Sequence, residues 1–311
     1  MHKYVVKRLI LLIPVILGIT FIVFSIMALT PGDPGKLILG PSAPQEAVAR
    51  LNEQLGFNRP FIVRFVDYIT DALKGDFGNS YRTGIPVFKE IFTRFPTTLT
   101  LAILAIITSI VIGIPLGILS AVKQYSLADV ISIVAAMLMA AVPGFWLGLM
   151  MIILFSQKLR LLPSNGIGSF AHFVMPTLIL AIPAAAEILR LMRTTMLETI
   201  RQDYIRTARA KGAPERTVIF KHALRNALLP VITIIGINFG SLLGGTIIAE
   251  AVFSMPGIGS LMLTAIRMKD IPQVMAIVIF LSVLFCIIMV LVDMFYAQID
   301  PRIKSRYISK G

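Results

Sequence analysis

Six long apolar segments dominate the sequence and determine where a chain like this can fold. A helix needs about 20 predominantly apolar residues to cross the roughly 30 Å hydrocarbon core of a bilayer. The sequence predicts six such transmembrane helices, at residues 9–29, 97–122, 130–156, 173–192, 229–252 and 274–299. Hydrophobic residues make up 57% of the 311 residues and charged residues only 14%, against about 45–50% and 25% in globular proteins. That composition excludes a soluble enzyme and a disordered chain.

Basic residues predict the orientation of these helices. The chain carries 29 Lys and Arg against 16 Asp and Glu, a net charge of +13. Membrane proteins retain such an excess in their cytoplasmic loops, so we expect no nucleic-acid partner. With both termini cytoplasmic, residues 1–8, 123–129, 193–228 and 300–311 face the cytoplasm. The first apolar segment is too long for a signal peptide and lacks a small-residue cleavage site near Leu29, so we expect an uncleaved helix.

The chain divides into four predicted parts: residues 1–29 with the first span, an extracytoplasmic segment at 30–96, a membrane core at 97–299 and a cytoplasmic tail at 300–311. The extracytoplasmic segment has apolar residues at helical spacing. This pattern predicts amphipathic helices at 46–55 and 60–73, and a third at 87–95 that continues into the second span.

Helix-breaking residues interrupt several spans. Glycine lets helices approach closely. Proline frees a backbone carbonyl, which must then accept a hydrogen bond inside the bundle or from water in a cavity. Pro and Gly are also simply commoner in membrane helices than in soluble ones, and this explanation stays open for any single position, including Gly113 and Pro183. The candidates for a pathway across the membrane or its gate are Pro143, Gly144, Gly240, Gly244 and the acid Glu250.

The sequence of the inner loop, residues 193–228, predicts a helix, a glycine and a second helix. The run 198–211 has apolar residues on one side, Gly212 can end it, and Pro214 can begin the next helix. A basic loop of this kind could lie against anionic lipid headgroups. The small residues Thr207, Ala208 and Ala210 and the scarcity of bulky apolar side chains favour a docking surface for a partner protein.

Two stretches of this loop resemble a known family. Residues 203–212 read Asp-Tyr-Ile-Arg-Thr-Ala-Arg-Ala-Lys-Gly, and residues 222–230 read His-Ala-Leu-Arg-Asn-Ala-Leu-Leu-Pro. They resemble the coupling loop of permease subunits of bacterial binding-protein-dependent ABC importers, more narrowly the dipeptide and oligopeptide branch. The chain keeps Ala208, Gly212 and Leu224 of the superfamily motif but has Arg206 in place of its Glu. Four other stretches also resemble this branch: residues 31–34, 75–78, 250–259 and 300–302.

The resemblance implies a fold and a set of partners. The fold is that of a type I ABC importer permease, an all-α polytopic membrane protein of six transmembrane helices with a long extracytoplasmic segment after helix 1 and a helix-Gly-helix coupling loop. The implied partners are a homologous second permease forming a heterodimer, two cytoplasmic ATPase subunits that bind ATP and Mg, and an extracytoplasmic binding protein that delivers di- or oligopeptides. The residues it assigns to ATPase coupling are Asp203, Tyr204, Arg206, Thr207, Ala208, Arg209, Ala210, Lys211, Gly212, Ala213 and Pro214. Those it assigns to binding-protein docking are Asp33, Asp76, Pro256 and Gly257.

The residues offer no catalytic or cofactor chemistry of their own. The sequence has no Gly-x-x-x-x-Gly-Lys-Ser/Thr phosphate loop, no His spacing for a metal and a single cysteine, Cys286. We therefore expect no catalytic residue, metal or cofactor in this chain. The 15 Met residues could indicate soft-metal transport but more often fill gaps in apolar packing. Energy would then come from partner ATPases, with alternating access by rocking of helix bundles.

Acids within spans are costly unless they face a partner, water or a bundle interior. We expect Glu187 to pair with Arg190, and Asp293 to pair with Arg302 or reach the membrane surface. Glu250 either contacts the loop that follows it or takes part in gating or in holding a peptide amino group.

Several cargoes fit the same plan. A nickel, metal-chelate or glutathione importer is an alternative to a peptide importer, and an autonomous channel or secondary carrier is an alternative from a different class. The helix-Gly-helix loop favours an importer, because an autonomous carrier does not need a docking surface for an ATPase. In either case, we expect a multi-pass protein of the bacterial cytoplasmic membrane.

Overall fold

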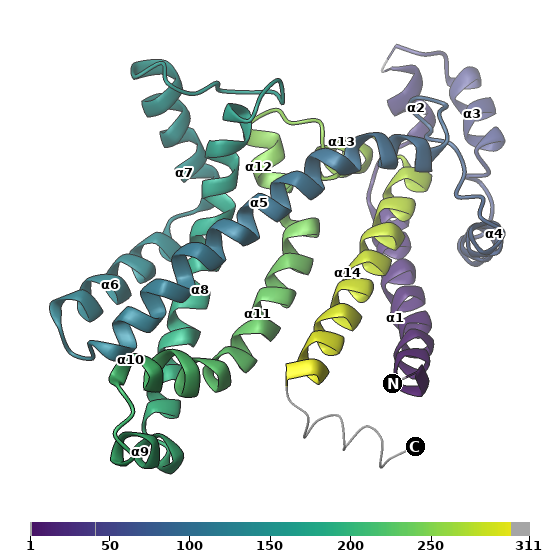
Figure 1. Cartoon of the computed structure of the whole chain (residues 1–311). Helices are drawn as coiled ribbons and strands as arrows, with labels where there is room; N and C mark the ends of the chain where they lie inside the picture. The colour runs from purple at the N-terminus through teal and green to yellow at the C-terminus, as the bar shows by residue number, and fades with distance from the viewer. Residues whose placement is uncertain (1, 41, 300–311) are drawn as a thin grey trace. The chain divides into compact units, whose positions relative to one another are not determined.

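The computed structural model describes residues 2–40 and 42–299, and within them the regular structure is helical apart from one antiparallel bridge between Asn79 and Pro86 (Figure 1). The helices group into two compact units. Unit 1 contains residues 99–255 and 287–299, and unit 2 contains residues 2–98 and 256–286. The first helix thus groups with the extracytoplasmic segment, whereas the predicted four-part division stays a prediction. The predicted tail at 300–311 lies outside the described residues.

Unit 1 is built around α8 (Ala171–Ile200), which packs against α6, α7, α11, α12 and the π-helix η2 of the same unit. Met175 and Ile179 near its start and Met192 and Met196 near its end lie in buried apolar clusters. The other elements that belong wholly to this unit are α6 (Leu127–Ala141), α7 (Gly144–Met151), the π-helix η1 (Ile152–Lys158), α9 (Asp203–Ala210), α10 (Glu215–Thr217), the π-helix η2 (Val218–Ala223), α11 (Leu224–Gly245) and α12 (Ile247–Val252).

The helix α5 (Val87–Val122) approaches α8 closely within unit 1. A Cβ atom at Gly113 would lie 2.8 Å from the carbonyl oxygen of Ala185, and one at Gly117 would lie 2.6 Å from Cβ of Met192. Residues four apart lie on the same helix face. The two glycines therefore allow a backbone approach that any side chain would prevent.

Unit 2 contains α1 (His2–Leu29), α2 (Pro34–Leu39), α3 (Gln45–Gln54), α4 (Phe61–Leu73), α13 (Ile258–Arg267), the first turns of α5 and most of α14 (Ile271–Ile299). Its core joins α1 to α13 and α14 through Phe24, Ala265 and Met275. The helix α4 packs here as its pattern predicts, because the rings of Phe61 and Phe65 lie 5.2 and 5.5 Å from that of Phe24. The end of the apolar face does not pack, since Leu73 is 84% exposed.

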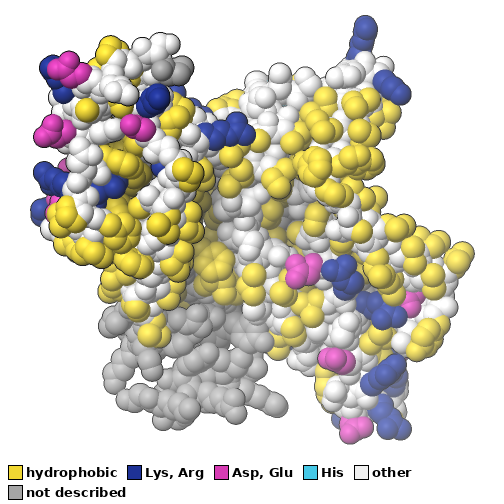
Figure 2. Space-filling model, turned by 180° about the vertical axis from the view of Figure 1, so that it is seen from behind, with side chains coloured by type: hydrophobic (Ala, Val, Ile, Leu, Met, Phe, Trp, Pro, Cys, Tyr) yellow, Lys and Arg dark blue, Asp and Glu magenta, His cyan; other side chains and the backbone are white. Residues whose placement is uncertain are grey.

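Four helical stretches of the described residues are long and apolar enough to cross a membrane: Val87–Val122, Ala171–Ile200, Glu215–Val252 and Ile271–Val292. A fifth arises if α6 and the helix Gly144–Lys158 count as one broken span. The apolar helix Ile13–Leu29 within α1 is too short to count among these stretches. The predicted count of six therefore stays a prediction. Figure 2 shows hydrophobic side chains over much of the visible face of unit 1, with many charged ones toward the end that carries α9 and α10.

The predicted third span, 130–156, is not one straight helix. It consists of two helices inclined at 96°, with the break at Val142 and Pro143. Val142 is extended, with ψ 125°, because a residue that precedes proline is sterically pushed out of the helical region. By contrast, α8 runs without interruption through Pro183, and α5 continues from the predicted amphipathic stretch at 87–95 into the second span.

Candidate functional site

The helix α9 and the bend that follows it form a compact element at the same end of unit 1 as the turn between α5 and α6 (Figure 1). The predicted helix 198–211 differs at its start, because residues 198–200 belong to α8 and α9 begins at Asp203 after a break at Arg201 and Gln202. The next helix begins at Glu215, after Pro214 as predicted, and continues through η2 into α11. The element is therefore joined on both sides to long helices.

Gly212 closes α9 with a specific capping geometry. The N–H of Gly212 donates to the carbonyl of Arg209 at 2.9 Å, and the N–H of Ala213 donates to that of Ala208 at 3.2 Å. This pair of bonds is a Schellman motif, which requires a left-handed residue after the helix. Gly212 has φ +80°, a conformation that costs a residue with a Cβ atom about 1–2 kcal/mol.

A buried anchor holds α9 on unit 1. Ile205 is completely buried in a cluster with Met196 of α8 and with Val218 and Ala223 of η2. Burying one such side chain contributes about 1.5–3 kcal/mol. Sequence reasoning left the apolar face open between Tyr204 and Ile205 and did not count Ile205 among the site residues, although its spacing of three from Ala208 was the available signal.

Two polar contacts fix the element further. Asn226 Nδ2 of α11 donates to the hydroxyl of Tyr204 at 2.7 Å. Across the bend, Arg209 donates to both carboxylate oxygens of Glu215, with Nε···Oε2 at 3.1 Å and Nη2···Oε1 at 2.6 Å. The remaining predicted coupling residues present side chains or backbone to the surface, because of the eleven only Ala208 and Ala213 are half-buried and the rest are exposed.

The predicted pathway residues lie in different parts of unit 1. Pro143 and Gly144 form the corner between α6 and α7, Gly240 is buried within α11, and Gly244 is exposed near the end of that helix. The helix α7 packs on α12 at Gly148, where a Cβ atom would lie 3.1 Å from Cγ1 of Val252.

Glu250 is fully buried in α12. Its carboxylate accepts a hydrogen bond from the hydroxyl of Thr246 at 2.9 Å, and its backbone carbonyl accepts one from the N–H of Met255 at 2.8 Å. Glu250 therefore contacts the segment that follows it through its backbone, and its part in gating stays a prediction.

The predicted docking residues all belong to unit 2 but differ in exposure. Asp76 is exposed, Asp33 and Pro256 are half-buried, and Gly257 is buried at the start of α13. Asp33 caps α2 by accepting from the N–H of Lys36 at 3.1 Å, and it also accepts from Asn52 Nδ2 at 2.7 Å. The bond from Asn52 is the largest contribution to a lowered pKa of the Asp33 carboxyl.

Sequence reasoning missed a pair of adjacent residues that holds unit 2 together. The amine of Lys269 donates to the backbone carbonyls of Thr30 and Gly32, at 2.9 Å for Gly32. Asp270 accepts from the hydroxyl of Ser80 and caps α14 through the N–H of Gln273 at 3.3 Å. The order Asp-Ile-Pro at the start of α14 was the available signal, because Asp followed by Pro in the first turn is typical of a helix start.

The predicted pair of Glu187 and Arg190 does not form within the described residues. Arg193, one turn further along α8, instead pairs with Asp129 at the start of α6. This pair escaped sequence analysis because its partners are 64 positions apart. The side chain of Asp293 and the whole of Arg302 lie outside the described residues, so their pairing stays a prediction.

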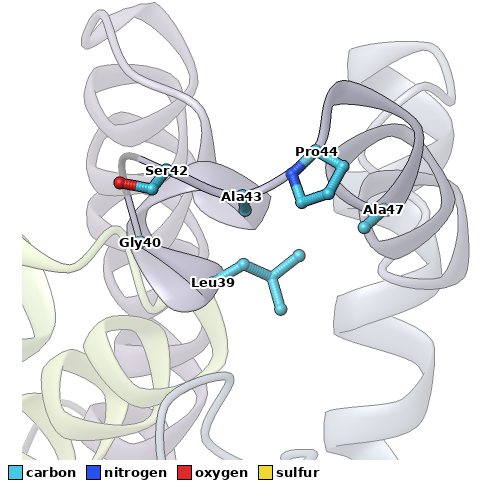
Figure 3. A pocket seen from close by; sticks show the side chains of 6 residues that line it. All are labelled: Leu39, Gly40, Ser42, Ala43, Pro44 and Ala47. Carbon is cyan, nitrogen blue, oxygen red and sulfur yellow. The ribbon is translucent and has the colours of Figure 1, made fainter.

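A hollow of about 530 Å³ lies beside the turn between α2 and α3, lined by Leu39, Gly40, Ser42, Ala43, Pro44 and Ala47 (Figure 3). None of these lining side chains carries a charge. Among the residues that the structure describes, no group of three or more His, Cys, Asp or Glu side chains could hold a metal.

The chain matches two family descriptions along most of its length. Residues 113–305 match the family described as binding-protein-dependent transport system inner membrane component, and residues 1–102 match the description of the N-terminal part of such membrane components. The dipeptide transport system permease protein DppB of Alkalihalophilus pseudofirmus is 40% identical, over 98% of this chain and 100% of that protein. The glutathione transport system permease protein GsiC of Salmonella choleraesuis is 41% identical over the same shares.

Solved structures agree at the level of the fold. An inward-facing structure of the MetNI methionine ABC transporter has a TM-score of 0.58 at 22% identity, covering 69% of this chain and 98% of the other. A crystal structure of an amino acid ABC transporter with histidines has a TM-score of 0.54 at 13% identity, covering 68% and 94%. The predicted type of fold is thereby confirmed. The chain belongs to the binding-protein-dependent transport system inner membrane component family, the multi-pass membrane permease subunits of ABC importers.

Proposed function

We propose that this chain is the permease subunit of an ATP-driven importer for short peptides, and that partner ATPases drive alternating access by moving α9 and the bend at Gly212. The observation that carries the proposal is the contrast within α9. Its polar face and the bend are exposed, while Ile205 anchors the opposite face in the core of unit 1. An ATPase that moved the exposed face would thus displace helices of the core with it.

The relatives support short peptides as the cargo. One is named for dipeptide transport and the other for glutathione transport, at nearly equal identity. Dipeptides and glutathione, which is a tripeptide, share amide bonds and free carboxylates. Short peptides are therefore the first candidate cargo and glutathione the second.

The proposed assembly is a heterodimer with a homologous permease, two cytoplasmic ATPases that bind ATP and Mg, and a peptide-binding protein outside the membrane. The basic residues around α9 support cytoplasmic termini and a cytoplasmic α9, by the tendency of cytoplasmic loops to retain Lys and Arg. Asp76, which is exposed, is the docking candidate best placed to meet the binding protein.

The test adds bulk to the exposed face without straining the helix. Ala210 is exposed near the end of α9, and arginine is a good helix former, so Ala210→Arg should leave the fold intact. In the complete transporter, we expect this variant to lose ATPase co-purification and ATP-dependent uptake of a labelled dipeptide. Arg50→Lys, on the exposed face of α3, is the control and should retain both.

A second variant tests the bend. Gly212→Val places a β-branched residue at φ +80°, with no atom within 4 Å to block it. Gly84→Val is the matched control, because Gly84 has φ +68° and equally open space. Retention of ATPase binding and uptake by both Ala210→Arg and Gly212→Val would overturn the proposal. So would movement of solute by this chain alone in vesicles that contain no partner protein.

A further inference from the structure

A largely buried ion pair joins α6 to α8 close to the coupling element. Arg193 Nε lies 2.7 Å from Oδ1 of Asp129, and Nη2 lies 2.9 Å from Oδ2, so the guanidinium donates to both carboxylate oxygens. The side chain of Asp129 is 3% exposed and that of Arg193 is 21% exposed. A two-point contact of this kind fixes the angle between its partners as well as their distance.

The carboxylate of Asp129 also organises the turn between α5 and α6. It accepts from the hydroxyl of Ser120 near the end of α5 and from the N–H of Tyr125 at 2.9 Å. Tyr125 has φ +64°, a left-handed conformation that a tyrosine rarely adopts unless its surroundings impose it. Three consecutive pieces of chain are therefore arranged around one side chain: the end of α5, the turn and the start of α6.

Arg193 connects this turn to the coupling element. It lies on α8 between Met192 and Met196, which share a buried cluster with Ile205 of α9. A second contact, from Arg201 Nη2 to Gln124 Oε1 at 3.4 Å, ties the same turn to the residue that follows α8. The segment between α5 and α6 is therefore held at Arg193 and at Arg201, about two helical turns apart. The stretch between these two residues leads directly into α9.

Stability alone is a weak explanation for such a pair, because the free energy that it costs to remove two charges from water can exceed their mutual attraction. We propose that Asp129 and Arg193 are positioning residues that transmit the displacement of α9 and α8 to α6. This inference rests on the proposed function, in which ATPases engage α9. The two-point geometry makes α8 and the α5–α6 turn move as one body.

The experiment uses the complete transporter with both permeases, its ATPases and the binding protein, in vesicles. ATP hydrolysed and labelled dipeptide taken up are measured in the same preparation, and their ratio reports coupling. Arg193→Lys retains the positive charge but replaces the planar fork with a point charge. We expect it to bind the ATPases normally and to lower the dipeptide transported per ATP by roughly two- to thirty-fold, the range seen for residues that carry coupling.

Two further variants separate positioning from a purely structural role. The double variant Asp129→Glu with Arg193→Lys lengthens the acid where the base is shorter, and we expect it to recover part of the lost ratio. Ser120→Ala removes one bond to the carboxylate while the ion pair stays, and we expect it to lower the ratio as well. A structural role would instead lower the amount of assembled transporter and leave the ratio unchanged.

The outcomes distinguish this inference from the proposed function. A normal ratio in Arg193→Lys overturns the inference; if that variant does not assemble, a normal ratio in Ser120→Ala overturns it. The Arg50→Lys control should keep the normal ratio. If Ala210→Arg retains ATPase binding and uptake, the proposed function fails. If Ala210→Arg blocks both while Arg193→Lys is fully coupled, only the present inference fails.

Discussion

Arg209 binds both carboxylate oxygens of Glu215 across the bend at Gly212, at 3.1 and 2.6 Å. The contact has good geometry, but the side chains are 39% and 56% exposed. Water screens exposed ion pairs, so this bond and the buried Ile205 should contribute very differently to the stability of the coupling element.

Glu215→Gln should have a small effect. Loss of an exposed ion pair costs about 0–1 kcal/mol, so we expect α9 to stay folded and uptake to stay near normal. Hydrogen–deuterium exchange of residues 203–214 measures the effect. Opening of the whole element in this variant would mean that the ion pair, and not the apolar anchor, holds α9.

Ile205→Ala should have a large effect. Truncating a buried Ile costs about 2–5 kcal/mol, and the cluster beneath α9 would retain a cavity. We expect faster hydrogen–deuterium exchange in 203–214 with little change in the rest of unit 1. Ile205→Val is the matched control, with an expected cost of about 0.5–1.5 kcal/mol.

Gly117→Ala should weaken the contact between α5 and α8. The added Cβ atom would lie 2.6 Å from Cβ of Met192 and 2.8 Å from the carbonyl oxygen of Leu189, so the helices must separate. Overpacking of this kind costs about 1–3 kcal/mol, which thermal unfolding of the purified protein can detect. Gly18→Ala on α1 is the control, because nothing lies within 4 Å of its added Cβ, and it should be neutral or slightly stabilising.

Acid should loosen α2 through Asp33. The folded-state pKa of this carboxyl is lowered from 3.8, chiefly by the hydrogen bond from Asn52. Its stabilising contribution is thus complete above the unfolded pKa and is lost as the pH falls through the lower folded value. We expect hydrogen exchange of residues 34–39, corrected for the intrinsic effect of pH, to accelerate over that acidic range. Asp33→Asn still has a capping oxygen but does not titrate there, so the same response in this variant would contradict the assignment.

The features that sequence alone could predict depend on local chemistry. Gly212 and Pro214 were placed at the bend because a left-handed glycine and a proline at the start of a helix act through their own backbone. The predicted break at Pro143 has the same origin. Its angle of 96° does not, because the direction of the second helix is determined by packing of α7 on α12.

Features that depend on contacts between distant segments could not be predicted. Asp129 and Arg193 are 64 positions apart, and Lys269 and Thr30 are 239 positions apart. Taken alone, the charged residues Asp129, Arg193 and Lys269 resemble ordinary loop or helix-end charges in the sequence. Only the packing of α6 on α8, and of the start of α14 on residues 30–32, brings each pair together.

The unbroken course of α8 has a mechanical consequence. Its 30 residues span about 45 Å at 1.5 Å per residue, which is close to the full thickness of a bilayer with its headgroups. For a stiff rod of that length, a displacement of about 5 Å at one end corresponds to a tilt of only about 6°. A change in which side of the membrane is open therefore does not require this helix to unwind or kink. A slight tilt is enough to transmit the displacement from one leaflet to the other.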